Sequence, residues 1–190
     1  GISASGLPAL PLTRSVQGDL GMRWSATGVL DADGPWLEEQ SRTWNLAPGD
    51  LSAACRWRRE DPDFLPEDEP ERRIDRALAV SCVTHALRRH CGSLETIYIP
   101  KQGTEFIQRG LDLRNVPLMV GTGGMLVHDS EGERSLAAAL DRGTKQSLTP
   151  RDPAVVLDRR YILAAAGLLA TKDRRAAHAL LRAEIANAAV

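Results

Sequence analysis

The sequence predicts an α/β protein with a mixed sheet, flanking helices and a small helical subdomain, and three observations support this class. A continuous apolar segment at 116–120 runs directly into Gly121-Thr122-Gly123-Gly124, as a buried strand runs into a turn. The segment 71–90 has a broad apolar face, which is typical of a helix that covers a sheet. Two Ala/Leu-rich segments, 159–170 and 173–189, indicate further helices. With 190 residues, 43% of them hydrophobic, the chain is long enough for one sizeable core.

The first part of the chain divides into two predicted regions. Residues 1–30 form a lead-in and the start of the core, with a helix at 15–30 for which Asp19 is the candidate N-cap. Residues 31–71 are rich in Pro, Asp, Glu and Trp and are expected to form the small helical subdomain, which ends in an acidic Glu-Asp-Glu-Pro-Glu tether. Short helices are expected there at 36–44 and 48–60.

Residues 72–190 are predicted to form the rest of the core, entered through the helix at 71–90. Pro70 suits the first turn of that helix and Gly92 suits its end. Apolar or small residues recur at four-residue spacing along it, at Ile74, Leu78, Cys82 and Ala86.

Two strand patterns follow, at 94–100 and 104–109, and the short turn between them predicts a hairpin. In the apolar strand at 116–120, Pro117 indicates the start of the strand or an edge position. A helix is expected at 131–142. A loop containing Pro150 and Pro153 precedes the two C-terminal helices.

Charge and composition argue against several classes of partner. There are 24 basic and 25 acidic side chains, so the formal net charge is -1 and no broad positive field attracts nucleic acid or an anionic membrane. No run approaches the roughly 18 to 20 apolar residues that cross a bilayer. The three cysteines lack a Cys-x-x-Cys spacing, so neither a disulfide framework nor a zinc site is indicated. We therefore predict a cytoplasmic protein that binds neither nucleic acid nor membrane.

The glycine turn after the apolar strand is the candidate binding site. Gly121, Thr122, Gly123 and Gly124 place backbone N–H groups at the carboxyl end of a strand, where α/β proteins bind nucleotides. The pattern does not fit a Rossmann fingerprint, because a third glycine at the required offset is missing, and a P-loop is excluded because no Gly-Lys-Ser/Thr occurs. A tight strand exit without a ligand remains the structural alternative.

Other conspicuous side chains have structural interpretations that we favour. Arg23 is expected to be exposed or paired, the Arg56–Arg59 run to be a solvated helix end, and the Asp158–Tyr161 run to cap and pack a helix. We favour an N-cap role for Asp19 over the alternative that it is a supporting group near a nucleotide. Four residues lie close enough in sequence to suggest metal ligands, but their spacing favours buried or capping roles, so no metal is predicted: Cys82, His85, His90 and Cys91.

Three segments in the same order, 17–26, 99–128 and 148–170, resemble the glutamate mutase reactivating factor family, also called MutL. That name is shared with a DNA mismatch-repair ATPase, which this sequence does not resemble. The resemblance implies one lobe of an actin-like ATPase fold, the ribonuclease H-like fold shared by actin, Hsp70 and sugar kinases. It also implies ATP and Mg²⁺ as ligands of the full-length protein and an adenosylcobalamin-dependent mutase, such as glutamate mutase, as its partner.

Within that resemblance, Gly121–Gly124 matches the motif that holds the adenosine side of the nucleotide. Residues 1–30 then contain the start of the second lobe's core, 31–71 its outer subdomain and 72–190 its nucleotide-binding core. The turn at 18–21 resembles the one that leads from the sheet to this subdomain.

The sequence also departs from the family's pattern. The phosphate motif Asp-x-Gly-Gly is absent, and Gln17 stands where the family leads us to expect Glu. The string that fits Asp-x-Gly-Ser/Thr, Asp141-Arg142-Gly143-Thr144, lies at the end of the predicted helix at 131–142 and does not follow a predicted strand, so we do not interpret it as a phosphate motif. Because those motifs hold Mg²⁺ and the γ-phosphate, no catalytic residue is assigned here. We expect a fragment that holds the adenosine-side half of a site, with ATP hydrolysis confined to the full-length protein. The alternatives are a small-molecule kinase of the same fold and a non-catalytic interaction module.

Overall fold

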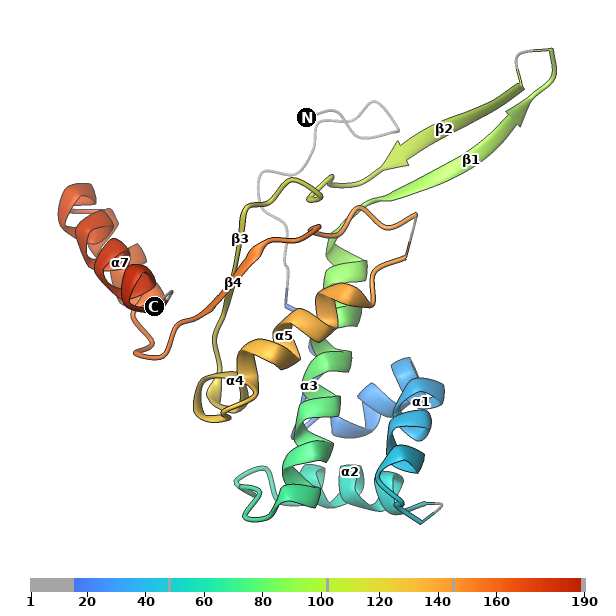
Figure 1. Cartoon of the computed structure of the whole chain (residues 1–190), viewed down its shortest axis with the longest axis vertical. Helices are drawn as coiled ribbons and strands as arrows, with labels where there is room; N and C mark the ends of the chain where they lie inside the picture. Colours follow the sequence, from blue (N-terminus) through green and yellow to red (C-terminus); the bar gives the residue numbers. More distant parts are fainter. Residues whose placement is uncertain (1–15, 48, 102, 145, 189–190) are drawn as a thin grey trace.

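The computed structural model describes residues 16–47, 49–101, 103–144 and 146–188, which contain seven helices and four strands (Figure 1). Their order along the chain is α1 (Ala26–Thr43), α2 (Asp50–Glu60), α3 (Glu69–His90), β1 (Ser93–Ile99), β2 (Gly103–Arg109), β3 (Leu118–Gly121), α4 (Gly124–His128), α5 (Gly132–Asp141), β4 (Ala154–Leu157), α6 (Leu163–Ala170) and α7 (Arg174–Ala188).

Helix α3 is the axis of the molecule, as its predicted broad burial implies. Asp68 caps its N-terminus by accepting a hydrogen bond from the Glu71 backbone N–H at 2.9 Å. One side of α3 packs on α1, and Arg58 of α2 donates to Asp75 of α3, whereas Thr84 on another side donates to the carbonyl of Ala139 in α5. The helices α1, α2 and α3 share a core made by Ala26, Val29, Leu37, Leu51, Cys55, Ile74, Ala77 and Leu78.

The start of the chain differs from the prediction. The helix predicted at 15–30 with Asp19 as its N-cap is wrong, because α1 begins at Ala26 and Ser25 holds the N-cap position. Helix α1 then continues through Pro35 to Thr43, with non-helical dihedral angles at Asp33. Pro35 is tolerated because this kink makes it an early residue of a second helical segment.

The predicted hairpin is confirmed. Strands β1 and β2 pair antiparallel from Ser93 opposite Arg109 to Ile99 opposite Gly103. They form an arm that projects from the body of the molecule (Figure 1). Glycine suits the turn because Gly103 has a φ of 94°.

The predicted strand at 116–120 corresponds to β3, which pairs in parallel with β4. Strand β4 was missed: its Ala-Val-Val-Leu run follows Pro153, and the prolines favoured a loop. The described strands form two two-stranded sheets instead of one continuous mixed sheet. Isolated bridges, Cys91 with Leu111 and Ser93 with Ser147, connect the hairpin to the segments that lead into β3 and β4.

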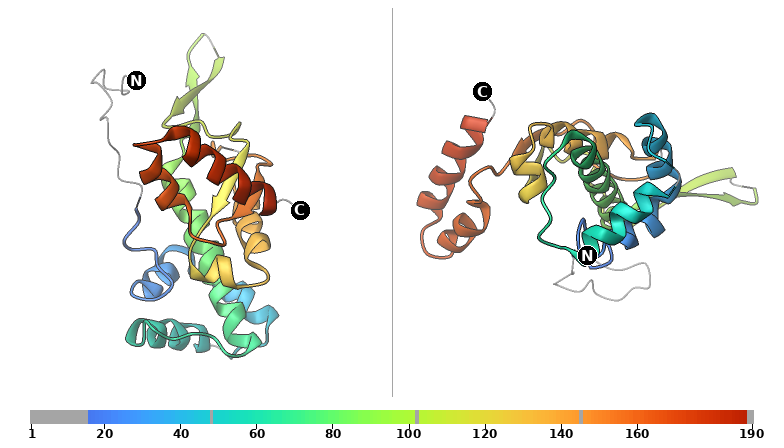
Figure 2. Two further views of the ribbon diagram at one scale, coloured as in Figure 1. Left: turned by 90° about the vertical axis from the view of Figure 1, so that its left-hand side faces the viewer. Right: turned by 90° about the horizontal axis from the view of Figure 1, so that it is seen from below.

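In the C-terminal part of the chain, helix α5 lies between α3 and β4 and contacts both elements. The predicted helix at 159–170 starts later, at Leu163, because the Asp158 carboxylate accepts the backbone N–H groups of Ile162 and Leu163 at 2.9 and 3.1 Å. Helices α6 and α7 pack on each other and stand at one side of the body (Figure 2). Among the described residues, no helix combines the length and apolar character needed to span a membrane.

Candidate functional site

The glycine turn has two halves with different environments. Gly121 is buried at the end of β3, where an added Cβ would lie 2.7 Å from the Cδ2 atoms of both Leu136 and Leu157. Thr122, Gly123 and Gly124 are exposed, and an added Cβ at either of these two glycines would meet open space. Gly121 is thus explained by packing, whereas the following three residues leave backbone accessible to a ligand.

Gly123 also shapes the turn. Its φ of 104° is in the region that favours glycine, and its carbonyl accepts the Val127 N–H at 3.0 Å to start α4. A side chain at this position would strain the backbone whatever space it has.

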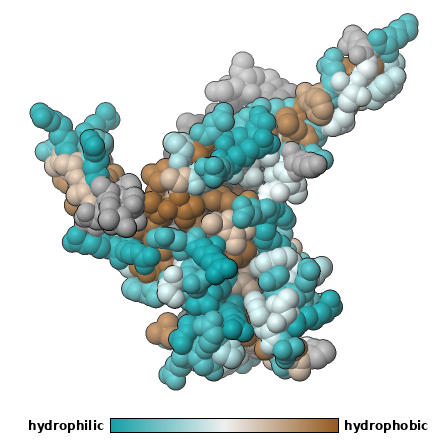
Figure 3. Space-filling model, viewed as in Figure 1, coloured by the Kyte–Doolittle hydropathy of each residue, from teal (hydrophilic) through white to brown (hydrophobic). Residues whose placement is uncertain are grey.

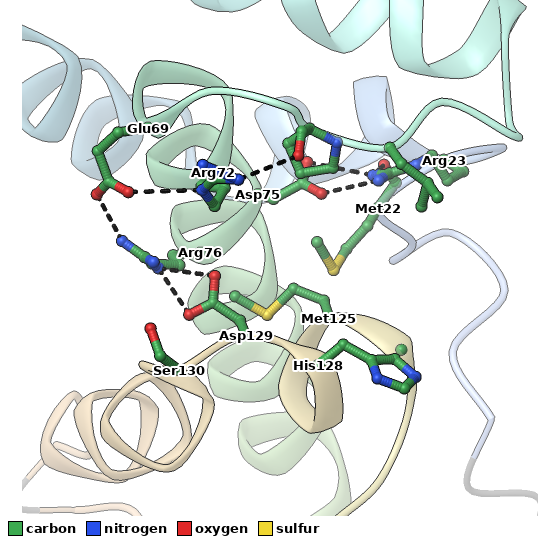
Figure 4. Close-up of a pocket in the computed structure, with 13 residues that line it drawn as sticks. Met22, Arg23, Glu69, Arg72, Asp75, Arg76, Met125, His128, Asp129 and Ser130 are labelled. Atoms are coloured by element: carbon green, nitrogen blue, oxygen red, sulfur yellow. Dashed lines mark hydrogen bonds and ion pairs between the residues drawn. The ribbon is translucent and has the colours of Figure 1, made fainter.

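A cavity of about 820 Å³ opens beside this turn, between α3 and α4 (Figure 4). Gly124 contributes to its wall together with residues from three other segments of the chain. The lining residues are Met22, Arg23, Leu65, Pro66, Glu69, Arg72, Asp75, Arg76, Gly124, Met125, His128, Asp129 and Ser130.

One wall of the cavity is charged and internally paired. Arg76 of α3 donates to both carboxylate oxygens of Asp129, at 3.0 and 3.1 Å, and to Glu69 at 2.8 Å. Burial opposes the charge of Arg76, but the hydrogen bonds to Asp129 and Glu69 outweigh it and raise the pKa of the guanidinium. The bond from Arg76 holds the pKa of Glu69 below its usual value. These pairs tie the segment after α4 to α3.

The other wall is apolar. The thioether side chains of Met22 and Met125 point into the space between α3 and α4 in Figure 4. Leu65 and Pro66 continue this wall, and Leu65 is 75% exposed. Arg72 is placed by bonds from its guanidinium to the carbonyls of Pro66 and Glu67, at 3.4 and 2.9 Å.

A buried ion network supports the cavity at its edge. Asp75 of α3 accepts two hydrogen bonds from Arg23, at 2.7 and 3.2 Å, and one from Arg58 of α2 at 2.8 Å. Arg58 is fully buried and also donates to Glu71 at 2.6 Å. Arg23 is therefore paired, as predicted. The prediction of a solvated run at 56–59 is wrong for Arg58, because the matching carboxylates come from α3, far along the chain.

Asp19 does not line the cavity. Its carboxylate accepts a 2.8 Å hydrogen bond from Arg89, which holds the pKa of Asp19 below its usual value, and Gln17 accepts from the same guanidinium at 2.9 Å. These bonds join the first turn of the described chain to the end of α3. A supporting role for Asp19 near a nucleotide stays a prediction.

The structure also shows the environment of the 158–161 run and of two metal-ligand candidates, Cys82 and His85. The capping role of the 158–161 run is confirmed, because the Asp158 carboxylate accepts from the first backbone N–H groups of α6. The packing role is not confirmed, because Arg159, Arg160 and Tyr161 are exposed, although the Tyr161 hydroxyl lies 3.2 Å from His128 Nε2. Burial raises the pKa of the Cys82 thiol to about 12, and the His85 ring lies beside Asp33 at 3.3 Å. No group of three or more potential ligands among His, Cys, Asp and Glu is found within the described part of the chain.

Sequence reasoning missed most of the cavity wall. Glu69, Arg72 and Arg76 share one face of α3. This polar face, opposite the apolar face of the helix, was the sequence pattern that could have indicated the cavity wall. Met22, Met125 and Asp129 gave no signal, because only tertiary packing brings them to that face.

The fold and the site define an α/β protein with a ligand-sized cavity next to an exposed glycine turn. The model of the family described as MutL protein matches residues 1–185. Protein MutL of Clostridium tetanomorphum is 38% identical over 171 residues, which are 90% of this chain and 36% of that protein. The chain therefore belongs to the MutL protein family, which confirms the resemblance, and it spans about a third of the length of this curated relative. No solved structure matches the chain.

Proposed function

We propose that this chain supplies the nucleoside-binding half of an ATP site in a MutL protein. We further propose that ATP binding by the whole protein drives the reactivation of an adenosylcobalamin-dependent mutase such as glutamate mutase. The observation that carries the proposal is the exposed backbone of Thr122, Gly123 and Gly124, of which Gly124 lines a cavity of about 820 Å³.

The walls of the cavity suit a purine nucleoside. Its volume is within the range of about 300 to 1,000 Å³ that is typical of small-molecule sites. The sulfur atoms of Met22 and Met125 can contact an aromatic ring, and the planar guanidinium of Arg72 can stack on one. The Glu69 carboxylate can accept a hydrogen bond from the exocyclic amine of adenine. The glycine backbone permits close approach of the ribose.

We assign the chemistry at the γ-phosphate to another part of the MutL protein. This sequence lacks Asp-x-Gly-Gly, and its Asp-x-Gly-Thr string at 141–144 lies at the end of helix α5, where Arg142 is paired with Asp33. Mg²⁺ and the γ-phosphate would therefore be held by the part of a MutL protein that this chain does not match. The chain alone is expected to bind adenosine and ATP weakly. It is not expected to hydrolyse ATP. In the whole protein, nucleotide binding would change the affinity for the mutase by favouring one of two conformations.

The test is a nuclear magnetic resonance titration of the chain with adenosine, ATP and tripolyphosphate. Adenosine and ATP are expected to shift the amide signals of Thr122, Gly124 and Arg72, whereas tripolyphosphate is not. Gly124→Leu would fill the cavity mouth and abolish the shifts. Gly34→Leu is the matched control, because Gly34 is also helical, also has open space at its Cβ and does not line the cavity.

Three outcomes would contradict the proposal. Absence of any response to adenosine would favour a non-catalytic interaction module. Mg²⁺-dependent ATP turnover by the chain alone would exclude a half-site. Phosphorylation of a small molecule by a full-length MutL protein, without an effect on a mutase, would favour the kinase alternative.

A further inference from the structure

Helix α6 has an uncharged surface that is largely open to solvent. All eight residues from Leu163 to Ala170 are apolar or glycine, yet only Ala166 is buried. Leu168 is 74% exposed and Leu169 is 36% exposed. Single exposed leucines are common on protein surfaces, but a helix that is apolar on every side is normally covered.

The shape of this surface suits another helix. Ala164, Ala165 and Leu168 lie on one face because they are three or four residues apart, and all three are exposed. Gly167 lies next to them, with no atom within 4 Å of an added Cβ. Small residues beside one large apolar side chain allow the backbone of a second helix to approach closely. We call Ala164, Ala165, Gly167 and Leu168 the α6 face.

The neighbouring sheet is also incomplete. The carbonyls of Pro117 and Gly121 accept from Ala154 and Asp158, so alternate residues of β3 bond to β4 and the backbone groups of Leu118 and Val120 point the other way. No described strand pairs with that outer edge. Parallel sheets are normally buried on both faces, but a hydrophobic area over β3 and β4 lies at the surface in Figure 3.

We propose that the α6 face is a contact surface for the remainder of a MutL polypeptide, meaning the part of the family protein that this chain does not match. The family model includes α6, so this helix belongs to the shared part of the family. The matched region is 36% of the Clostridium relative, which leaves most of that protein to supply a covering helix. This surface does not depend on nucleotide binding, so the two proposals can fail separately.

The test uses cysteine labelling of Leu168→Cys in the chain, with and without the unmatched part of Clostridium tetanomorphum MutL added as a separate polypeptide. The natural cysteines give little background: Cys55 and Cys91 are buried, and burial raises the pKa of Cys82 to about 12. The added polypeptide is expected to slow labelling of Leu168→Cys about tenfold at 90% occupancy.

Tyr98→Cys is the matched control, because Tyr98 is 75% exposed on the hairpin, and its labelling rate is expected to stay the same. Leu168→Glu is expected to weaken the complex in gel filtration, and Tyr98→Glu is not. The proposal is overturned if no complex forms, or if a complex forms and Leu168→Cys is labelled equally fast. Protection that depends only on the concentration of the chain would show that a second copy covers the face.

Discussion

Single carboxylates join helices that are far apart in the sequence. Asp33, at the kink of α1, accepts two hydrogen bonds from Arg142 at 2.6 and 2.9 Å and one from Ser81 at 2.6 Å. The Arg142 guanidinium also lies over the Trp36 ring, 3.9 Å from its centroid. Asp33 therefore connects α1 to α3 and to the end of α5, at the kink that precedes Pro35.

Asp33 should make the stability of the protein depend on acid pH. Burial acts to raise the pKa of Asp33, but the hydrogen bonds from Arg142, Ser81 and His85 outweigh it and lower the pKa below its usual value. A lowered pKa in the folded state stabilises the protein above the ordinary value of about 3.9, and this contribution is lost as the pH falls below it.

Asp33→Asn is expected to lower the free energy of unfolding by about 3 kcal/mol at neutral pH, the cost of breaking a buried ion pair. The difference from the unchanged protein should shrink between neutral pH and pH 3, because below about 3.9 the unfolded chain binds a proton at Asp33 more readily than the folded protein does. Urea unfolding at both pH values measures it. Asp31→Asn, an exposed carboxylate on the same helix, is the control. A difference for Asp33→Asn that is equal at both pH values would refute the assignment.

At the scale of elements, the turn between β3 and α4 combines a packing requirement with an accessible backbone. The buried Gly121 lets Leu136 of α5 and Leu157 of β4 close over the end of β3. Gly124, three residues later, starts α4 at the cavity without contacts that exclude a side chain. A sequence pattern cannot separate these roles, because both positions carry the same residue.

Gly121→Ala is expected to destabilise the fold by about 1 to 2 kcal/mol, because the new methyl group overpacks the contact with Leu136 and Leu157. Gly124→Ala should change the free energy of unfolding by less than about 0.5 kcal/mol. Urea unfolding of the two variants gives the comparison. Equal costs would mean that the two glycines share one role.

At the scale of the whole molecule, two extensions project from a body built around α3. The hairpin β1–β2 is mainly in contact with itself, and the α6–α7 pair contacts the body through β4 (Figures 1 and 2). The uncharged face of the hairpin exposes Tyr98 and Phe106, at 75% and 69%. The body carries the shared helical core and both ion networks, so it should determine the stability of the protein.

Replacing residues 96–106 with Asn-Gly would join Glu95 to Ile107, which are opposite each other in the hairpin, by a two-residue turn. The midpoint of thermal unfolding is expected to change by less than about 2 °C, which corresponds to less than about 1 kcal/mol for a chain of this length. Calorimetry of the shortened protein provides the measurement. A fall of more than about 4 °C would show that the hairpin stabilises the body.

The sequence predicted the elements whose signals are local. The position of Pro70 and the apolar spacing of α3, the hairpin turn and the apolar run of β3 are each signals within a few residues, and each of these predictions was confirmed. Strand β4 has only four residues between prolines and a helix, and it becomes a strand through pairing with β3. The predicted boundaries of the subdomain and the actin-like lobe remain predictions.

By itself the sequence determined the main helices, the hairpin, the position of the glycine turn and the family. Only the tertiary structure decided that Arg58 is buried, that Asp19 pairs with Arg89, and that α3 and α4 enclose a cavity lined by Met22 and Met125. The physical reason is that periodicity and capping depend on neighbours along the chain. Burial of a charge and closure of a cavity depend on partners outside that local range, such as Asp75, which is 17 residues from Arg58.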